Sequence, residues 1–78
     1  RASIRETVMK LSARNILKGK VRNITNGAVA SEVEVDVGNG NVITSTITVG
    51  SAKRLGLAEG KEVSVIIKAS EVIIGVDD

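Results

Sequence analysis

The chain has 78 residues and a formal net charge of +2, and it contains no Cys, His, Pro, Phe, Tyr or Trp. Its length allows one domain of marginal stability. Because the chain has no Cys or His, neither a disulfide nor a zinc site can stabilise the domain, and we expect it to associate with further copies of itself. The chain has no Cys, His or Tyr for catalysis, and a Ser nucleophile would lack a His base. Without aromatic rings it lacks the surfaces on which single-stranded nucleic acids stack. We expect a binding protein rather than an enzyme, and no nucleic acid among its partners.

The first residues, RASIRETVM, differ in character from the β-rich sequence that follows. We expect residues 1–9 to be an N-terminal extension, either an expression remnant or a linker from an upstream domain. Residues 10–78 are expected to form the domain. No apolar run approaches the roughly 20 residues of a membrane span, and no secretory segment is recognisable. We therefore expect a cytoplasmic protein without membrane contact.

The longest predicted strand is AVASEVEVDV (28–37), in which Val29, Val33, Val35 and Val37 share one face and polar residues share the other. The GNGN that follows at 38–41 is a hairpin signal. The other predicted strands are ILKGKVRNI (16–24), VITSTITV (42–49), KEVSVIIKAS (61–70) and EVIIGV (71–76).

The segment SAKRLGLAEG (51–60) predicts one short helical turn, with Ser51 as its N-cap and Gly56 or Gly60 at its end. Five strands with one helical turn, in a chain too short for a sandwich, indicate an all-β fold. The specific prediction is a five-stranded OB-like small barrel.

Hydrogen-bond donors gather in LSARN (11–15), on both sides of Gly50, and where the apolar run VSVII ends. Such donors, together with the N–H groups at a helix start, can bind an anion. Each also has a structural alternative: an N-cap, an ordinary strand residue, a solvated strand end or a surface charge. The residues concerned are Ser12, Arg14, Asn15, Thr48, Ser51 and Lys68, the last followed by the small Ala69.

A cation site is not expected. Glu32, Glu34 and Asp36 alternate along one predicted strand, which is typical of a solvated face, and no loop has the ligand spacing of a calcium site.

Three segments, SARNILKGKV, ITVGSAKRLGLAEGKEV and VIIKASEVIIGV, resemble the corresponding segments of the Mop family, the molbindins. These are small molybdate- and tungstate-binding domains, and the resemblance covers nearly all of the chain after Met9. It implies an OB-like fold whose protomers exchange strands into dimers, and for free-standing members a hexamer made of three dimers.

The resemblance also implies oxyanion sites between subunits, with molybdate or tungstate as the ligand. One chain would supply Ser12 and Arg14 with the backbone of Ala13 and Asn15. Its neighbour would supply Thr48, Ser51 and Lys68 with the backbone of Ala69. Molybdenum would be bound only as the oxyanion.

Two functions are compatible with the resemblance. The first is intracellular binding of molybdate or tungstate for storage or homeostasis. The second is a ligand-sensing regulatory domain from a molybdate-responsive transcription regulator or from a molybdate transporter ATPase. What precedes Met9 would distinguish the two. A nucleic-acid-binding OB module is a third reading, which the lack of stacking residues disfavours.

Overall fold

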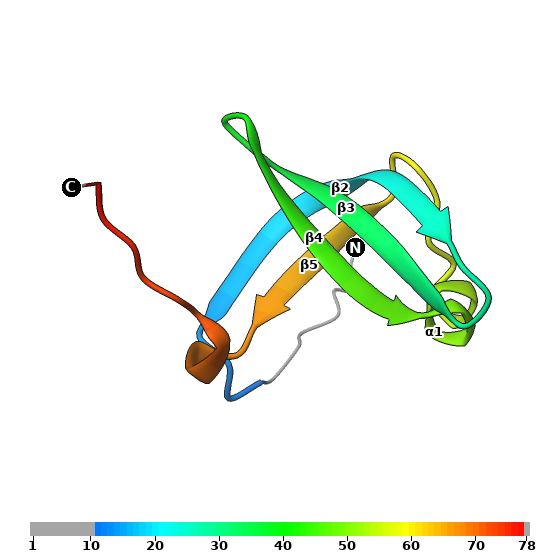
Figure 1. The fold of residues 1–78 in the computed structure, drawn as a ribbon. Coiled ribbons are helices and arrows are strands. Elements are labelled where there is room, and N and C mark those ends of the chain that lie inside the picture. The colour runs from blue at the N-terminus through cyan, green and yellow to red at the C-terminus, as the bar shows by residue number, and fades with distance from the viewer. Residues whose placement is uncertain (1–10, 78) are drawn as a thin grey trace, which may run out of the picture.

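The computed structural model describes residues 11–77, so the extension expected at residues 1–9 lies outside the described residues. The fold is all-β, a curled antiparallel sheet with one short α-helix, as predicted (Figure 1). The elements in chain order are β2 (Asn15–Asn26), β3 (Ala30–Gly38), β4 (Asn41–Thr48), α1 (Val49–Arg54), β5 (Glu62–Ile67) and the 3-10 turn η1 (Ala69–Glu71). Within residues 11–77, no helix has the length and apolar character that a membrane crossing requires.

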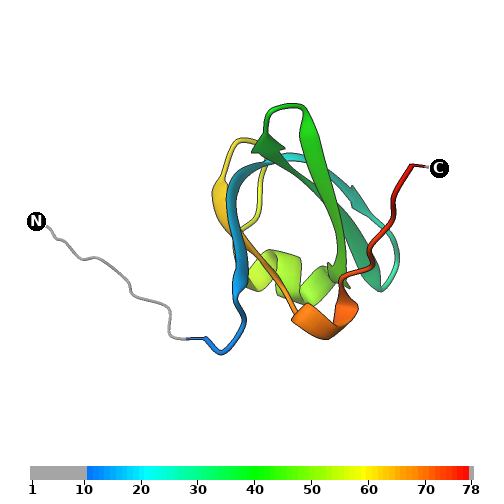
Figure 2. The ribbon, with the colours of Figure 1, turned by 90° about the vertical axis from the view of Figure 1, so that its left-hand side faces the viewer.

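The four strands lie in the order β4-β3-β2-β5, and every neighbouring pair is antiparallel. The long strand β2 belongs to both halves of the sheet: its first half pairs with β5 and its second half with β3. Lys20 lies where the halves meet, opposite Asp36 of β3 and Glu62 of β5. Because β2 continues from one half into the other, the sheet curls into a half-open barrel (Figure 2).

The curl depends on a close approach between β2 and β3. A Cβ atom on Gly19 would lie 2.6 Å from the carbonyl oxygen of Asp36 and 2.7 Å from a methyl carbon of Val35. Glycine is therefore the residue that permits this approach.

The core is built from the inner faces of the curled strands. Val21, Val33 and Val35 are buried, and six partly buried residues pack against them: Ile24, Val37, Ile47, Leu57, Val63 and Val65. The alternation predicted for 28–37 is thus confirmed for Val33, Val35 and Val37. It does not extend to Val29, which precedes β3 and is 75% exposed.

The inward position nearest the start of β3 belongs to Ser31, which has no exposed surface. Its hydroxyl donates to Oδ1 of Asn26, its register partner on β2, at 2.5 Å. A buried hydroxyl needs such a partner, and the pair fixes the register where the β2–β3 hairpin begins.

The hairpin predicted at 38–41 is confirmed. Asn39 and Gly40 both have positive φ angles, 56° and 79°, and they connect Gly38 to its register partner Asn41. Two central residues with positive φ are typical of a type I′ turn, whose twist matches that of the strands.

The predicted helical turn forms, but it begins earlier than expected. The N-cap is Thr48 rather than Ser51, because the Thr48 hydroxyl accepts the Ser51 N–H. At the other end, Gly56 has a φ of 63°. Its N–H donates to the carbonyl of Lys53, and the next N–H, that of Leu57, donates to Ala52. This bonding is a Schellman motif, so the expected termination at Gly56 is confirmed.

The fifth strand expected at 71–76 is not formed within this chain. After η1 the backbone runs away from the sheet as an extended segment, residues 72–77 (Figure 1). Ile73, Ile74 and Val76 are 93%, 83% and 89% exposed. A strand requires an edge to pair with, and this segment leads away from its own sheet.

Candidate functional site

The N-terminal donors lie beside the C-terminal ones. Asn15 opens β2 opposite Ile67, the last residue of β5, and its Nδ2 donates to the Ile67 carbonyl at 3.3 Å. Lys68 and Ala69 follow directly. The structure thus places the segments that carry six of the eight predicted site residues on either side of the Asn15–Ile67 pair. We call these residues the Arg14 group: Ser12, Ala13, Arg14, Asn15, Lys68 and Ala69.

The Arg14 group is open and cationic. Arg14 and Lys68 are exposed. The one ion pair within residues 11–77 joins Arg22 and Glu34 (3.5 Å), so neither Arg14 nor Lys68 is paired with an acidic residue of that range. A hollow of 360 Å³ adjoins the group, lined by Arg14, Asn15, Ile16, Leu17, Ile67 and Val72. Two cations beside hydroxyl and amide donors suit an oxyanion.

The remaining two predicted residues, Thr48 and Ser51, form a second group, the Ser51 group, where β4 passes into α1. The Thr48 Oγ1 accepts the Ser51 N–H at 3.0 Å, and the Thr48 hydroxyl donates to Ser51 Oγ at 2.9 Å. The Val49 N–H donates to the Val29 carbonyl at 2.8 Å. The backbone N–H groups of Val49 and Ser51 are therefore already hydrogen-bonded. Fewer free N–H groups remain at this helix start for binding an anion than the sequence predicted. Among residues 11–77, the Ser51 hydroxyl donates no hydrogen bond, so its proton can reach an acceptor outside this group.

The two groups lie at opposite ends of the sheet. The Arg14 group is at the start of β2, whereas Thr48 pairs with Ala30, just past the end of β2. β2 has twelve residues, so its ends are about 36 Å apart along the strand at the usual rise per residue. Figure 1 shows η1 and α1 well separated. Within one chain, Lys68 and Ala69 therefore lie with residues 12–15 rather than with Thr48 and Ser51.

Comparison with known proteins assigns the family. The profile of the TOBE domain matches residues 11–74, and the chain is 52% identical over 69 residues to the probable molybdenum-pterin-binding protein of Haemophilus influenzae, covering 88% of this chain and 100% of that protein. The chain belongs to the TOBE domain family. The predicted resemblance to Mop proteins is confirmed.

Solved structures agree with this TOBE assignment. MopII from Clostridium pasteurianum superposes with a TM-score of 0.81 at 42% identity, covering 86% of this chain and 100% of that one. ModG, a cytoplasmic molybdate-binding protein solved with molybdate bound, superposes with a TM-score of 0.85 at 48% identity, covering 88% of this chain and 49% of that one. The Haemophilus influenzae relative and ModG are both described as binding proteins.

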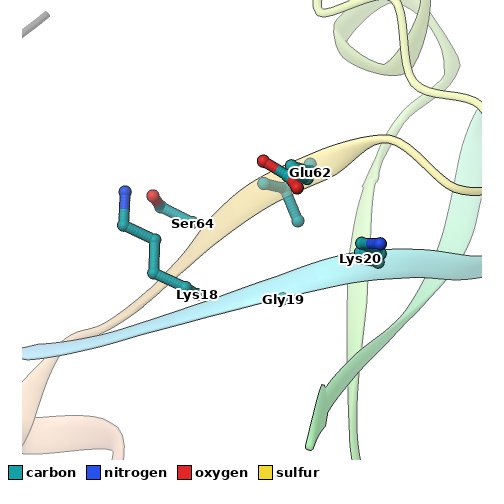
Figure 3. Close-up of a pocket in the computed structure, with 6 residues that line it drawn as sticks. Lys18, Gly19, Lys20, Glu62 and Ser64 are labelled. Carbon is teal, nitrogen blue, oxygen red and sulfur yellow. The ribbon is translucent and has the colours of Figure 1, made fainter. Parts of the chain in front are cut away.

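The TOBE domain has a larger hollow that sequence reasoning missed. It measures 600 Å³ and lies over the paired strands β2 and β5, where Lys18 is opposite Ser64 and Lys20 is opposite Glu62 (Figure 3). The alternation KGK at 18–20 was its only signal in the sequence. All its charged side chains are exposed, and Glu62 partly offsets the lysines. Across residues 11–77, no three acidic side chains gather closely enough to hold a metal ion.

Proposed function

We propose that this TOBE domain binds molybdate or tungstate at sites shared between subunits. The observation that carries the proposal is the placement of two incomplete donor groups at opposite ends of β2. A single tetrahedral anion cannot contact both groups of one chain, but the Arg14 group of one subunit can face the Ser51 group of another. The names of the relatives, which are molybdenum-pterin-binding and molybdate-binding proteins, support the choice of ligand.

The C-terminal segment supports assembly into a homo-oligomer. The segment 72–77 is extended and strongly apolar, and three of its side chains are almost fully exposed. The outer strands β4 and β5 flank a groove of 260 Å³ that opens onto the core, lined by Ile47, Leu55, Leu57, Val65 and Ile66 among others. An extended segment from a second copy that added to one of these edges would complete the barrel. Such strand exchange makes dimers, and three dimers would make the hexamer implied by the resemblance.

The eight proposed site residues, which would form a shell around the bound anion, determine which oxyanions the site can accept. None of the eight residues is acidic, so the shell has cations, hydroxyls and N–H groups to donate to anion oxygens. Hydrogen phosphate carries a proton that needs an acceptor, and an unpaired buried donor costs about 1–3 kcal/mol. Sulfate has no such proton at neutral pH. Only the size of the gap between subunits would favour the larger molybdate and tungstate over sulfate.

Such a domain would serve storage or homeostasis of the oxyanion in the cytoplasm. The Haemophilus influenzae relative, described as a probable molybdenum-pterin-binding protein, is matched over its entire length. That relative therefore consists of a single domain of this size. The proposed cytoplasmic location is supported by the similarity to ModG, which is described as cytoplasmic.

The first test is calorimetric titration with molybdate, tungstate, sulfate and phosphate, together with the mass in solution by light scattering. The parent should bind molybdate as an oligomer and sulfate weakly. Arg14→Ala and Lys68→Ala should each weaken binding while leaving a folded β protein. Arg22→Ala is the matched control, since Arg22 lies outside both groups and its exposed ion pair contributes little.

A mixing experiment tests whether the site is shared. Arg14→Ala and Ser51→Ala chains are unfolded together in equal amounts and refolded as mixed oligomers. If each site takes one group from each chain, a mixed dimer has one intact site and one doubly damaged site, so about a quarter of all sites should recover. Each variant refolded alone is the control. Weak binding in both variants without recovery in the mixture would refute the shared site, and no binding by the parent would refute the function.

A further inference from the structure

Two of the chain's asparagines, Asn26 and Asn39, are followed by glycine. Glycine has no side chain to shield its backbone nitrogen, so that nitrogen can attack the preceding Asn side-chain carbonyl most readily. Both asparagines are exposed and both lie at hairpins. The sequence context does not distinguish them, but their hydrogen bonds do.

At Asn26, both reacting groups are held. Its Oδ1 accepts the hydroxyl of the buried Ser31 at 2.5 Å, which fixes the side-chain carbonyl. The attacking atom would be the Gly27 nitrogen, whose N–H donates to the Ala30 carbonyl at 2.8 Å. Asn26 is also a paired residue of β2. Attack at this site requires the start of the β2–β3 hairpin to open.

At Asn39, neither reacting group is held. Asn39 and Gly40 are the two central residues of the β3–β4 turn. Among residues 11–77, no hydrogen bond engages the Asn39 side chain or the Gly40 N–H. Even an added Cβ on Gly40 would meet nothing within 4 Å, so the surrounding space is open. Rotation at the turn can therefore bring nitrogen and carbonyl together without breaking the sheet.

We propose that Asn39 is a site of spontaneous deamidation in the folded protein and that Asn26 is protected from it. The Gly40 nitrogen, losing its proton, forms a bond to Cγ of Asn39, and the side-chain nitrogen leaves as ammonia. Water then opens the resulting succinimide to aspartate or isoaspartate. The net change is the exchange of NH₂ for OH, with one water consumed and one ammonia released.

The two products should affect the hairpin differently. Aspartate suits a type I′ turn before glycine almost as well as asparagine does. Isoaspartate adds a backbone methylene, which is incompatible with the two-residue connection between Gly38 and Asn41. No residue of 38–41 belongs to the Arg14 group or to the Ser51 group, so we expect aspartate at position 39 to leave oxyanion binding unchanged.

The test is peptide mapping by mass spectrometry after incubation of the intact protein at mildly alkaline pH, natively and in denaturant. Natively, Asn39 should deamidate roughly tenfold or more faster than Asn26, because Asn26 reacts only through local opening. In denaturant the two rates should converge, since both sites then share an unfolded Asn-Gly context.

Ser31→Ala supplies the matched variant, because it removes the hydroxyl that holds Asn26 Oδ1 and leaves the β3–β4 turn untouched. It should raise the native rate at Asn26 severalfold and leave the rate at Asn39 unchanged. Equal native rates at the two sites would overturn the proposal. For each asparagine, the deamidation rate in denaturant divided by the native rate measures how strongly the fold protects it. Equal ratios for Asn39 and Asn26 would overturn the proposal as well.

Discussion

Gly19→Ala should be among the most damaging small substitutions in this domain. The added Cβ would lie 2.6 Å from the Asp36 carbonyl oxygen, 2.7 Å from a methyl carbon of Val35 and 3.1 Å from one of Val37. The Asp36 oxygen belongs to the backbone of β3, and Val35 is 4% exposed, so neither can simply rotate away. The strands would have to separate where the two halves of the sheet meet.

The cost can be bounded from these contacts. Overpacking a core with an extra carbon typically costs 1–3 kcal/mol. Two contacts well below van der Waals distance, one of them with backbone, place Gly19→Ala at the upper end, about 3 kcal/mol. A domain of this size has a total stability of roughly 4–12 kcal/mol. The substitution would therefore remove a quarter or more of the free energy of unfolding.

The assay is urea unfolding followed by far-UV circular dichroism, because the chain has no Trp or Tyr for fluorescence. Protein concentration is held constant, since assembly adds to apparent stability. Gly50→Ala is the control: its Cβ would approach nothing closer than 4.0 Å, and alanine in a helix is worth up to about 1 kcal/mol over glycine. If the free energy of unfolding of Gly19→Ala differs from that of the parent by less than about 0.5 kcal/mol, β2 and β3 do not approach each other as closely as described.

Three further predictions concern other parts of the fold. Lys61→Met removes an ammonium that donates to the Leu55 and Gly56 carbonyls at 2.9 and 3.3 Å and should cost up to about 1 kcal/mol. Lys53→Met is the control, because it removes the same charge from an exposed position of α1 and should lower the free energy of unfolding by less. Equal losses of unfolding free energy for the two variants in urea would contradict the role of Lys61. Gly56→Ala forces a Cβ into a φ of 63° and should lower the free energy of unfolding by about 1–2 kcal/mol, so an unchanged urea midpoint would argue against the Schellman cap. Deletion of residues 72–78 should convert the oligomer to monomers in light scattering, whereas an unchanged mass would rule out exchange of this segment.

Features that depend on near neighbours in the chain could be read from the sequence. The alternation of Val33, Val35 and Val37 set the inner face of β3, because a strand places every second side chain on the same side. Asn39 and Gly40 set the hairpin, since they tolerate positive φ. The same property made Gly56 and Gly60 the two candidates for the end of the helical turn, and the structure selects Gly56. The all-β class and the resemblance to Mop proteins rested on such local patterns together.

The tertiary structure decided what depends on residues distant in sequence. Thr48 rather than Ser51 caps α1, because pairing of β4 with β3 ends there and leaves its hydroxyl over the Ser51 N–H. Residues 71–76 have high β-propensity but form no strand, since a strand needs an edge and this segment leads away from its own. The sequence named the eight candidate site residues. Only the antiparallel pairing of β2 with β5 and of β3 with β4 divides them into two groups at opposite ends, because register and curl arise from contacts that no local pattern encodes.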